Sequence, residues 1–157
     1  MLDSLKNFLF DLTGGQKHPA RFEENDYRLA AAALLVHAST IDGTMKGAER
    51  DRLHAVLKER FSLDDRATEE LIDVGTLAEN VSVDLYHFTS LINRSLDEAG
   101  RLGIVEMMWE IVFADGRVNE FEDNLMWRAA DLLGVSSRDR IALRRRVAGE
   151  KAESSDA

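Results

Sequence analysis

Two long segments of the chain carry apolar residues on almost every side of the helices that they predict. The first, at about 24–41, has an unbroken apolar run from Leu29 to Val36 that includes four consecutive alanines. The second, at about 97–114, is apolar at most positions between Ile104 and Phe113. A helix that is apolar all round is buried among other helices. We therefore expect both segments at the centre of the fold, and we expect the alanines to let neighbouring helices approach closely.

The other segments carry apolar residues at three- and four-residue spacings, which is typical of amphipathic helices. They predict helices at about 47–61, and from about 64, 82, 119 and 136 onward. Ser82 is a suitable cap for the helix that begins there, and Asn119 with Glu122 fits a capping box. Glycines fit the ends of three helices, at Gly43, Gly116 and Gly134. The sequence predicts an all-α fold, a single compact bundle of seven to eight helices.

The two ends of the chain differ from the middle. Residues 1–12 predict an amphipathic helix with one apolar stripe, and 13–19 form a glycine- and proline-containing linker. We expect the helical domain at 20–148 and a flexible polar tail at 149–157. The stripe either packs on the rest of the protein or contacts a membrane surface. It consists of Leu2, Leu5, Phe8, Leu9 and Leu12.

Composition narrows the function classes. The chain has 157 residues, a formal net charge of −9 and no cysteine. The lack of cysteine excludes disulfides and thiolate sites, and the negative charge argues against nucleic-acid binding. No stretch is long and apolar enough for a transmembrane span, and residues 1–12 lack the features of a secretory signal. We expect a cytoplasmic protein, peripheral to the inner membrane if the stripe binds lipid. The last predicted helix is locally basic, which fits a solvated face, through Arg138, Arg140, Arg144, Arg145 and Arg146.

One signature occurs twice, 73 positions apart. Asp42-Gly43 is followed by Met45 and Glu49, and the same pattern recurs with Asp115-Gly116, Val118 and Glu122. The match extends to Arg28-Leu29 with Arg101-Leu102 and, one gap later, to 61–64 with 133–136. Two repeats are too few for a solenoid. We predict an internal two-fold pseudo-repeat in which the two apolar helices meet.

The doubled signature raises the question of a metal site. A calcium-binding EF-hand needs further acidic ligands at its first positions, where this chain has Ala38, Thr40, Ile111 and Phe113. A site shared between the two copies is the alternative, with Asp42, Glu49, Asp115 and Glu122 as ligands for Ca²⁺, Mg²⁺ or Mn²⁺. His37 and Glu110 occupy equivalent positions in the apolar helices and are candidate additional ligands, and Glu106 lies one turn before Glu110.

The same residues have a purely structural interpretation. Asp before Gly commonly forms a turn, and Glu49 and Glu122 fall in first helical turns, where a carboxylate complements the helix dipole. His37 can be a hydrogen-bonded core residue, and Glu106 and Glu110 can face solvent.

The two signatures, the alanine-rich helix at Leu29–Leu35 and the segment Trp127–Val135 together resemble the TerB-like domain of tellurite-resistance protein B, in its uncharacterised bacterial branch. The resemblance covers about Tyr27–Val147. It implies an all-α bundle with internal pseudo-symmetry, an acidic metal-binding surface and a role in stress-response or membrane-linked complexes. The four signature acids match the acidic positions of the family. Before the first Asp-Gly, the chain departs from the alanines common in the family and has Ala38-Ser39-Thr40-Ile41.

No catalytic motif accompanies these features. The chain lacks a nucleophile elbow, a phosphate-binding glycine loop and a zinc-binding histidine pair on one helix. We predict a non-enzymatic module that binds a divalent cation or docks a protein partner. A structural interaction domain without metal and a metal-dependent hydrolase are the alternatives.

Overall fold

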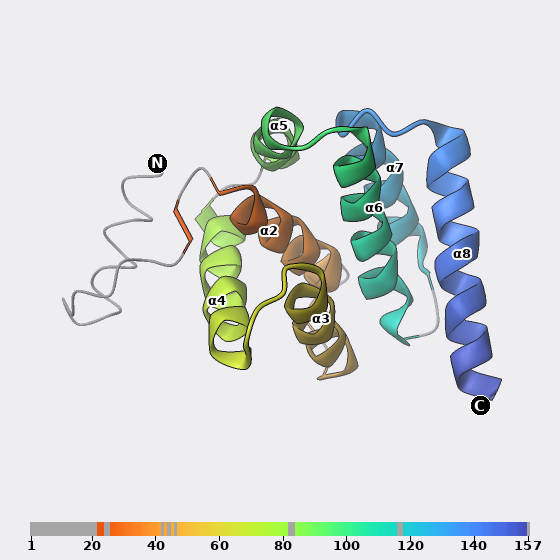
Figure 1. The fold of residues 1–157 in the computed structure, drawn as a ribbon. Helices are drawn as coiled ribbons and strands as arrows, with labels where there is room; N and C mark the ends of the chain where they lie inside the picture. Colours follow the sequence, from red (N-terminus) through yellow and green to blue (C-terminus); the bar gives the residue numbers. More distant parts are fainter. Residues whose placement is uncertain are drawn as a thin grey trace.

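A computed structural model describes residues 22–156, except 24, 25, 42, 44, 46, 82, 83, 116 and 117. These residues form seven α-helices and one 3₁₀ turn, and no strand occurs among them, which confirms the all-α prediction (Figure 1). The predicted helix at residues 1–12 lies outside the described residues. The elements are α2 (Tyr27–Thr40), α3 (Gly47–Arg60), α4 (Asp65–Val81), α5 (Leu85–Ser95), α6 (Glu98–Val112), η1 (Phe113–Asp115), α7 (Glu120–Leu132) and α8 (Ser137–Asp156).

Aspartates cap four of the helices, one of them α4, which is capped by Asp64. The side chains of Asp26, Asp84 and Asp97 accept hydrogen bonds from the first turns of α2, α5 and α6. Such a cap satisfies one of the backbone N–H groups that a helix start leaves without a partner. Ser82 was the wrong prediction for the cap of α5, because Asp84 accepts from the backbone of Tyr86 at 2.9 Å.

The alanine-rich helix α2 lies at the centre of the fold, where it contacts α3, α4, α5 and α6. Its residues from Leu29 to Val36 are all buried. The closest approach is to α4, where a Cβ added to Gly75 would lie 2.9 Å from the Cβ of Ala32. The small side chains therefore do allow a close approach between helices, as predicted from the sequence.

The second apolar helix, α6, contacts α2 and is covered by α3, α7 and α8 (Figure 1). Trp109 on α6 is fully buried and donates its indole N–H to the carbonyl oxygen of Arg140 on α8 at 3.2 Å. The two helices predicted to be central are thus in contact. The pseudo-two-fold relation between the halves stays a prediction.

The ends of α3 and α7 share one geometry. Ser62 and Gly134 have positive φ angles of 53° and 71°. The next residue donates its N–H back across the turn in both cases, Leu63 to Lys58 at 3.0 Å and Val135 to the equivalent carbonyl at 2.8 Å. This is the hydrogen bond of a Schellman helix end.

The final helix, α8, packs on α6 and α7 at one side of the bundle (Figure 1). Arg144 binds Asp123 on α7 at 2.9 Å, and Arg146 binds Glu106 on α6 at 3.3 Å. The helix continues to Asp156, beyond Gly149, where we expected a polar tail to begin. Among the described helices, none is both long and apolar enough to span a membrane.

Candidate functional site

The second acidic signature forms a complete helix start. Asn119 caps α7 and accepts from the N–H of Glu122 at 2.8 Å. Glu122 accepts in return from the N–H of Asn119 at 3.2 Å. This reciprocal pair is the capping box that the sequence predicts. The Glu122 side chain is almost fully buried, since the residue is 3% exposed.

The first signature lies between α2 and α3. Gly43 has a φ of 136°, a conformation that favours glycine, and donates its N–H to the carbonyl oxygen of Thr40 at 3.0 Å. Glu49 follows in the first turn of α3 and is also only 3% exposed. The two signature glutamates are therefore buried at equivalent places in two different helices.

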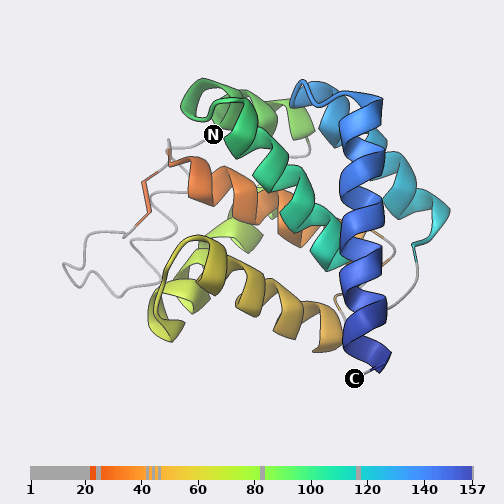
Figure 2. The ribbon, with the colours of Figure 1, turned by 45° about the vertical axis from the view of Figure 1, so that its right-hand side comes forward.

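The fold brings parts of the two signatures near each other. α3 contacts η1, the turn that contains the backbone of Asp115. Figure 2 shows the beginning of α3 on the side of the molecule where α6 ends. Asp42 and the side chain of Asp115 lie outside the described parts of the chain. The structure thus places Glu49 and Glu122, while the positions of the two aspartate carboxylates stay predictions.

The additional candidate ligands have protein partners. His37 lies 3.1 Å from Glu79 on α4, through its Nδ1 atom. Glu106 and Glu110 both accept from the guanidinium of Arg60, the last residue of α3. These contacts connect neighbouring helices, so the structure gives the three candidates a clear structural role.

Burial affects the titration of Glu110. Desolvation raises the pKa of its carboxyl group above the ordinary value, and Arg60 acts in the opposite direction. A carboxyl group with a raised pKa gives up its proton less readily and is a weaker ligand for a cation at low pH.

A polar cluster between α3 and α4 did not emerge from the sequence. His54 contacts Glu69 at 3.2 Å through Nδ1 and Asp65 at 3.1 Å through Nε2. Arg50 binds Glu69 at 3.0 Å, and Lys58 binds Asp65 at 2.7 Å and lowers the pKa of that exposed carboxyl. Because each ring nitrogen faces a different acid that already has a cation beside it, the cluster serves to connect two helices.

No group of three or more histidine, aspartate or glutamate side chains suited to a metal ion occurs in the part of the chain that the structure describes. Any site shared by the signatures therefore needs Asp42 or Asp115 in addition to the two buried glutamates.

Comparison with known protein families matches most of the chain to one family model. The family model described as tellurite resistance protein TerB matches residues 28–145, about three quarters of the chain. The chain belongs to the TerB family. The TerB domain thus begins in α2 and reaches into α8, and it contains both acidic signatures. No curated protein and no solved structure gave a significant match.

Proposed function

We propose that this TerB domain is a non-enzymatic module that binds a divalent cation between its two acidic signatures. The observation that carries the proposal is the burial of Glu49 and Glu122, each 3% exposed, at equivalent first-turn positions. Burying a carboxylate costs free energy unless hydrogen-bond donors or a cation compensate it. The contact between α3 and η1 supports a site that both signatures share.

Oxygen ligands determine which ions suit such a site. Asp42, Glu49, Asp115 and Glu122 offer carboxylates alone, and carboxylates prefer Mg²⁺, Ca²⁺ and Mn²⁺. The capping bond of Glu122 is compatible with ligation, because an ionised carboxylate offers about four lone-pair directions. A cation here would join the start of α3 to the start of α7.

Titration calorimetry with Ca²⁺, Mg²⁺ and Mn²⁺ tests the proposal. We expect one ion to bind with a dissociation constant below about 1 mM, and Glu49→Gln with Glu122→Gln to weaken it at least about tenfold. Asp42→Asn with Asp115→Asn has the same expected effect. Asp51→Asn with Glu120→Gln is the matched control, because both residues are exposed and lie in or near the same first turns. Absence of binding, or equal loss in the control, contradicts the proposed site.

The cellular part of the proposal concerns location and partners. We propose that the domain acts in the cytoplasm within a stress-response or membrane-linked complex, with residues 1–12 as a peripheral membrane contact. The sequence supports this through the apolar stripe of that segment. Flotation of the full chain and of a variant lacking residues 1–15 with anionic vesicles tests it. Equal flotation of the two proteins contradicts the membrane contact.

A further inference from the structure

Three large apolar side chains are exposed on the adjacent helices α7 and α8, and one of them, Phe121, lies six residues from Trp127 and therefore on another side of α7. Trp127 on α7 is 53% exposed and Ile141 on α8 is 40% exposed. α7 and α8 contact each other, and in Figure 2 α7 passes obliquely behind α8 at the right-hand edge of the molecule. A tryptophan in such a position is a common anchor of protein interfaces.

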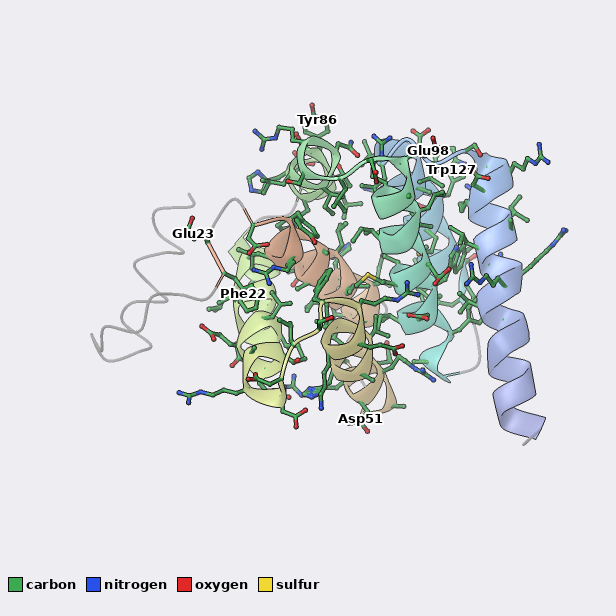
Figure 3. All side chains as sticks on the ribbon, in the orientation of Figure 1. Phe22, Glu23, Asp51, Tyr86, Glu98 and Trp127 are labelled. Carbon is green, nitrogen blue, oxygen red and sulfur yellow. The ribbon has the colours of Figure 1, made fainter. Side chains whose placement is uncertain are left out.

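The ion pair between Asp123 and Arg144 fixes how the two antiparallel helices align. Because α7 and α8 run in roughly opposite directions (Figure 1), each residue further along α7 corresponds approximately to one residue earlier on α8. Trp127, four residues after Asp123, is therefore level with Arg140 and beside Ile141. Figure 3 labels Trp127 close to the beginning of α8, in agreement with this alignment.

Charged residues of opposite sign border this apolar pair. Glu120 and Asp131 share a stripe of α7 with Trp127, because they are seven and four residues from it. Arg138 and Arg145 share a stripe of α8 with Ile141, at three and four residues. All four charged residues are exposed, and none of them forms an ion pair within the described part of the chain. The face thus has an acidic edge on α7 and a basic edge on α8.

We propose that this α7–α8 face binds the same face of a second copy of the chain, about a two-fold axis parallel to the helices. Such a rotation keeps every residue at its height and places α7 of one copy over α8 of the other. Asp131 then faces Arg138, Glu120 faces Arg145 and Trp127 faces Ile141. By the alignment above, the charged pairs are offset by two residues, about 3 Å along the helix, which an arginine side chain can span.

The occupant is a second copy because the face is complementary to itself. A purely acidic partner matches only the α8 edge, and a purely basic partner matches only the α7 edge. In the two-fold arrangement, the acidic α7 edge of each copy instead pairs with the basic α8 edge of the other copy. The same arrangement buries Trp127 against an apolar side chain. Opposite charges in register favour this partner and disfavour others.

The size of the face predicts a weak dimer. α7 has 13 residues and is about 20 Å long, and two helices side by side are about 20 Å wide. A footprint of about 20 Å by 20 Å buries about 800 Å² in total, below the roughly 1,200 Å² of standard interfaces and in the range of weak, transient ones, so we expect a dissociation constant on the order of 10 µM or weaker.

Sedimentation velocity on the full chain tests the proposal, over about 1–300 µM protein, with EDTA present so that the result is independent of the proposed cation site. Two charge-reversed variants provide the main test. One carries Glu120→Arg with Asp131→Arg on α7, and the other carries Arg138→Glu with Arg145→Glu on α8. We expect each variant alone to self-associate at least about tenfold more weakly. An equimolar mixture of the two should form a one-to-one heterodimer, because the acidic and basic edges then match again.

The controls separate this interface from general effects of charge. Asp51→Arg with Glu59→Arg on α3, and Arg66→Glu with Arg94→Glu on α4 and α5, change the net charge equally at exposed positions and should dimerise like the wild type. Far-UV circular dichroism establishes that every variant is folded, and recovery of dimer in the mixture excludes misfolding as the cause of the loss. A monomeric wild type, unchanged self-association of both reversed variants, or failure of the mixture to pair overturns the proposal.

Fluorescence gives a second readout. Trp127 is exposed whereas Trp109, the other tryptophan, is buried. Association should shift the emission of Trp127 to shorter wavelength as protein concentration rises. The Trp127→Phe variant should show no such shift. A concentration-independent spectrum in the wild type counts against the dimer.

Discussion

Replacing Gly75 with alanine tests how closely α2 and α4 approach. The new Cβ would lie 2.9 Å from the Cβ of Ala32, 3.1 Å from its carbonyl carbon and 3.3 Å from the nitrogen of Ala33. Ordinary carbon–carbon contacts are about 3.5–4.0 Å. Two of the three atoms belong to the backbone of α2, so a side-chain rotation cannot relieve the overlap and the helices must move apart.

The magnitude follows from two opposing effects. Overpacking of a close-packed core costs about 1–3 kcal/mol, whereas alanine gains about 1 kcal/mol over glycine within a helix. Because two of the three contacts are with backbone atoms, the cost falls in the upper part of that range, at about 2–3 kcal/mol. We therefore expect Gly75→Ala to lower the free energy of unfolding by about 1–2 kcal/mol. For a chain of this size, that change lowers the melting temperature by roughly 2–8 °C.

The control is the same substitution where space is open. An added Cβ at Gly103 in α6 would meet no atom within 4 Å outside its own helical surroundings. Gly103→Ala should therefore raise the free energy of unfolding by up to about 1 kcal/mol. Urea unfolding followed by circular dichroism measures both variants. If Gly75→Ala is as stable as the wild type while Gly103→Ala behaves as expected, the reasoning from close approach is refuted.

Three further predictions concern helix ends and charge. Ser62→Gly should raise the free energy of unfolding by about 0.5–1 kcal/mol, because a residue with a positive φ of 53° is strained unless it is glycine; an unchanged urea midpoint contradicts this. Asn119→Ala should lower the free energy of unfolding by about 1 kcal/mol, because the capping box with Glu122 is lost. A melting temperature equal to that of the wild type would contradict this prediction. Burial raises the pKa of Glu110, so its contribution to stability is present at low pH and declines as the pH rises through that pKa. Glu110→Gln should therefore gain stability relative to the wild type as the pH rises above the ordinary carboxyl pKa of about 4.3, and a difference in urea midpoints that does not change with pH is the contrary result.

Local signals made much of the fold predictable. The apolar run from Leu29 to Val36 identified a central helix, because a helix without a polar face has no other stable place. The capping box at Asn119 depends on residues three positions apart and is visible in the sequence for that reason. The cap of α5 was missed because Ser82 and Asp84 are both good capping residues and lie two positions apart.

Contacts between helices were less predictable. His54 meets Asp65 and Glu69 across two helices, and Arg60 meets Glu106 and Glu110 across a larger separation in sequence. Spacing along one helix carries no information on such pairs. For the candidate site, the sequence identified the two glutamates that the structure shows to be buried, and the metal ion itself remains a prediction.

The position of α2 determines how the domain can open. α2 contacts α3, α4 and α5, and it also contacts α6 from the other half of the chain. Separating the two halves therefore removes the packing of α6 on α2. Its amide protons should therefore exchange with solvent only through global unfolding, and they should be the slowest in the protein. A fragment that ends before Glu98 would leave the apolar surface of α2 exposed and would aggregate in place of folding.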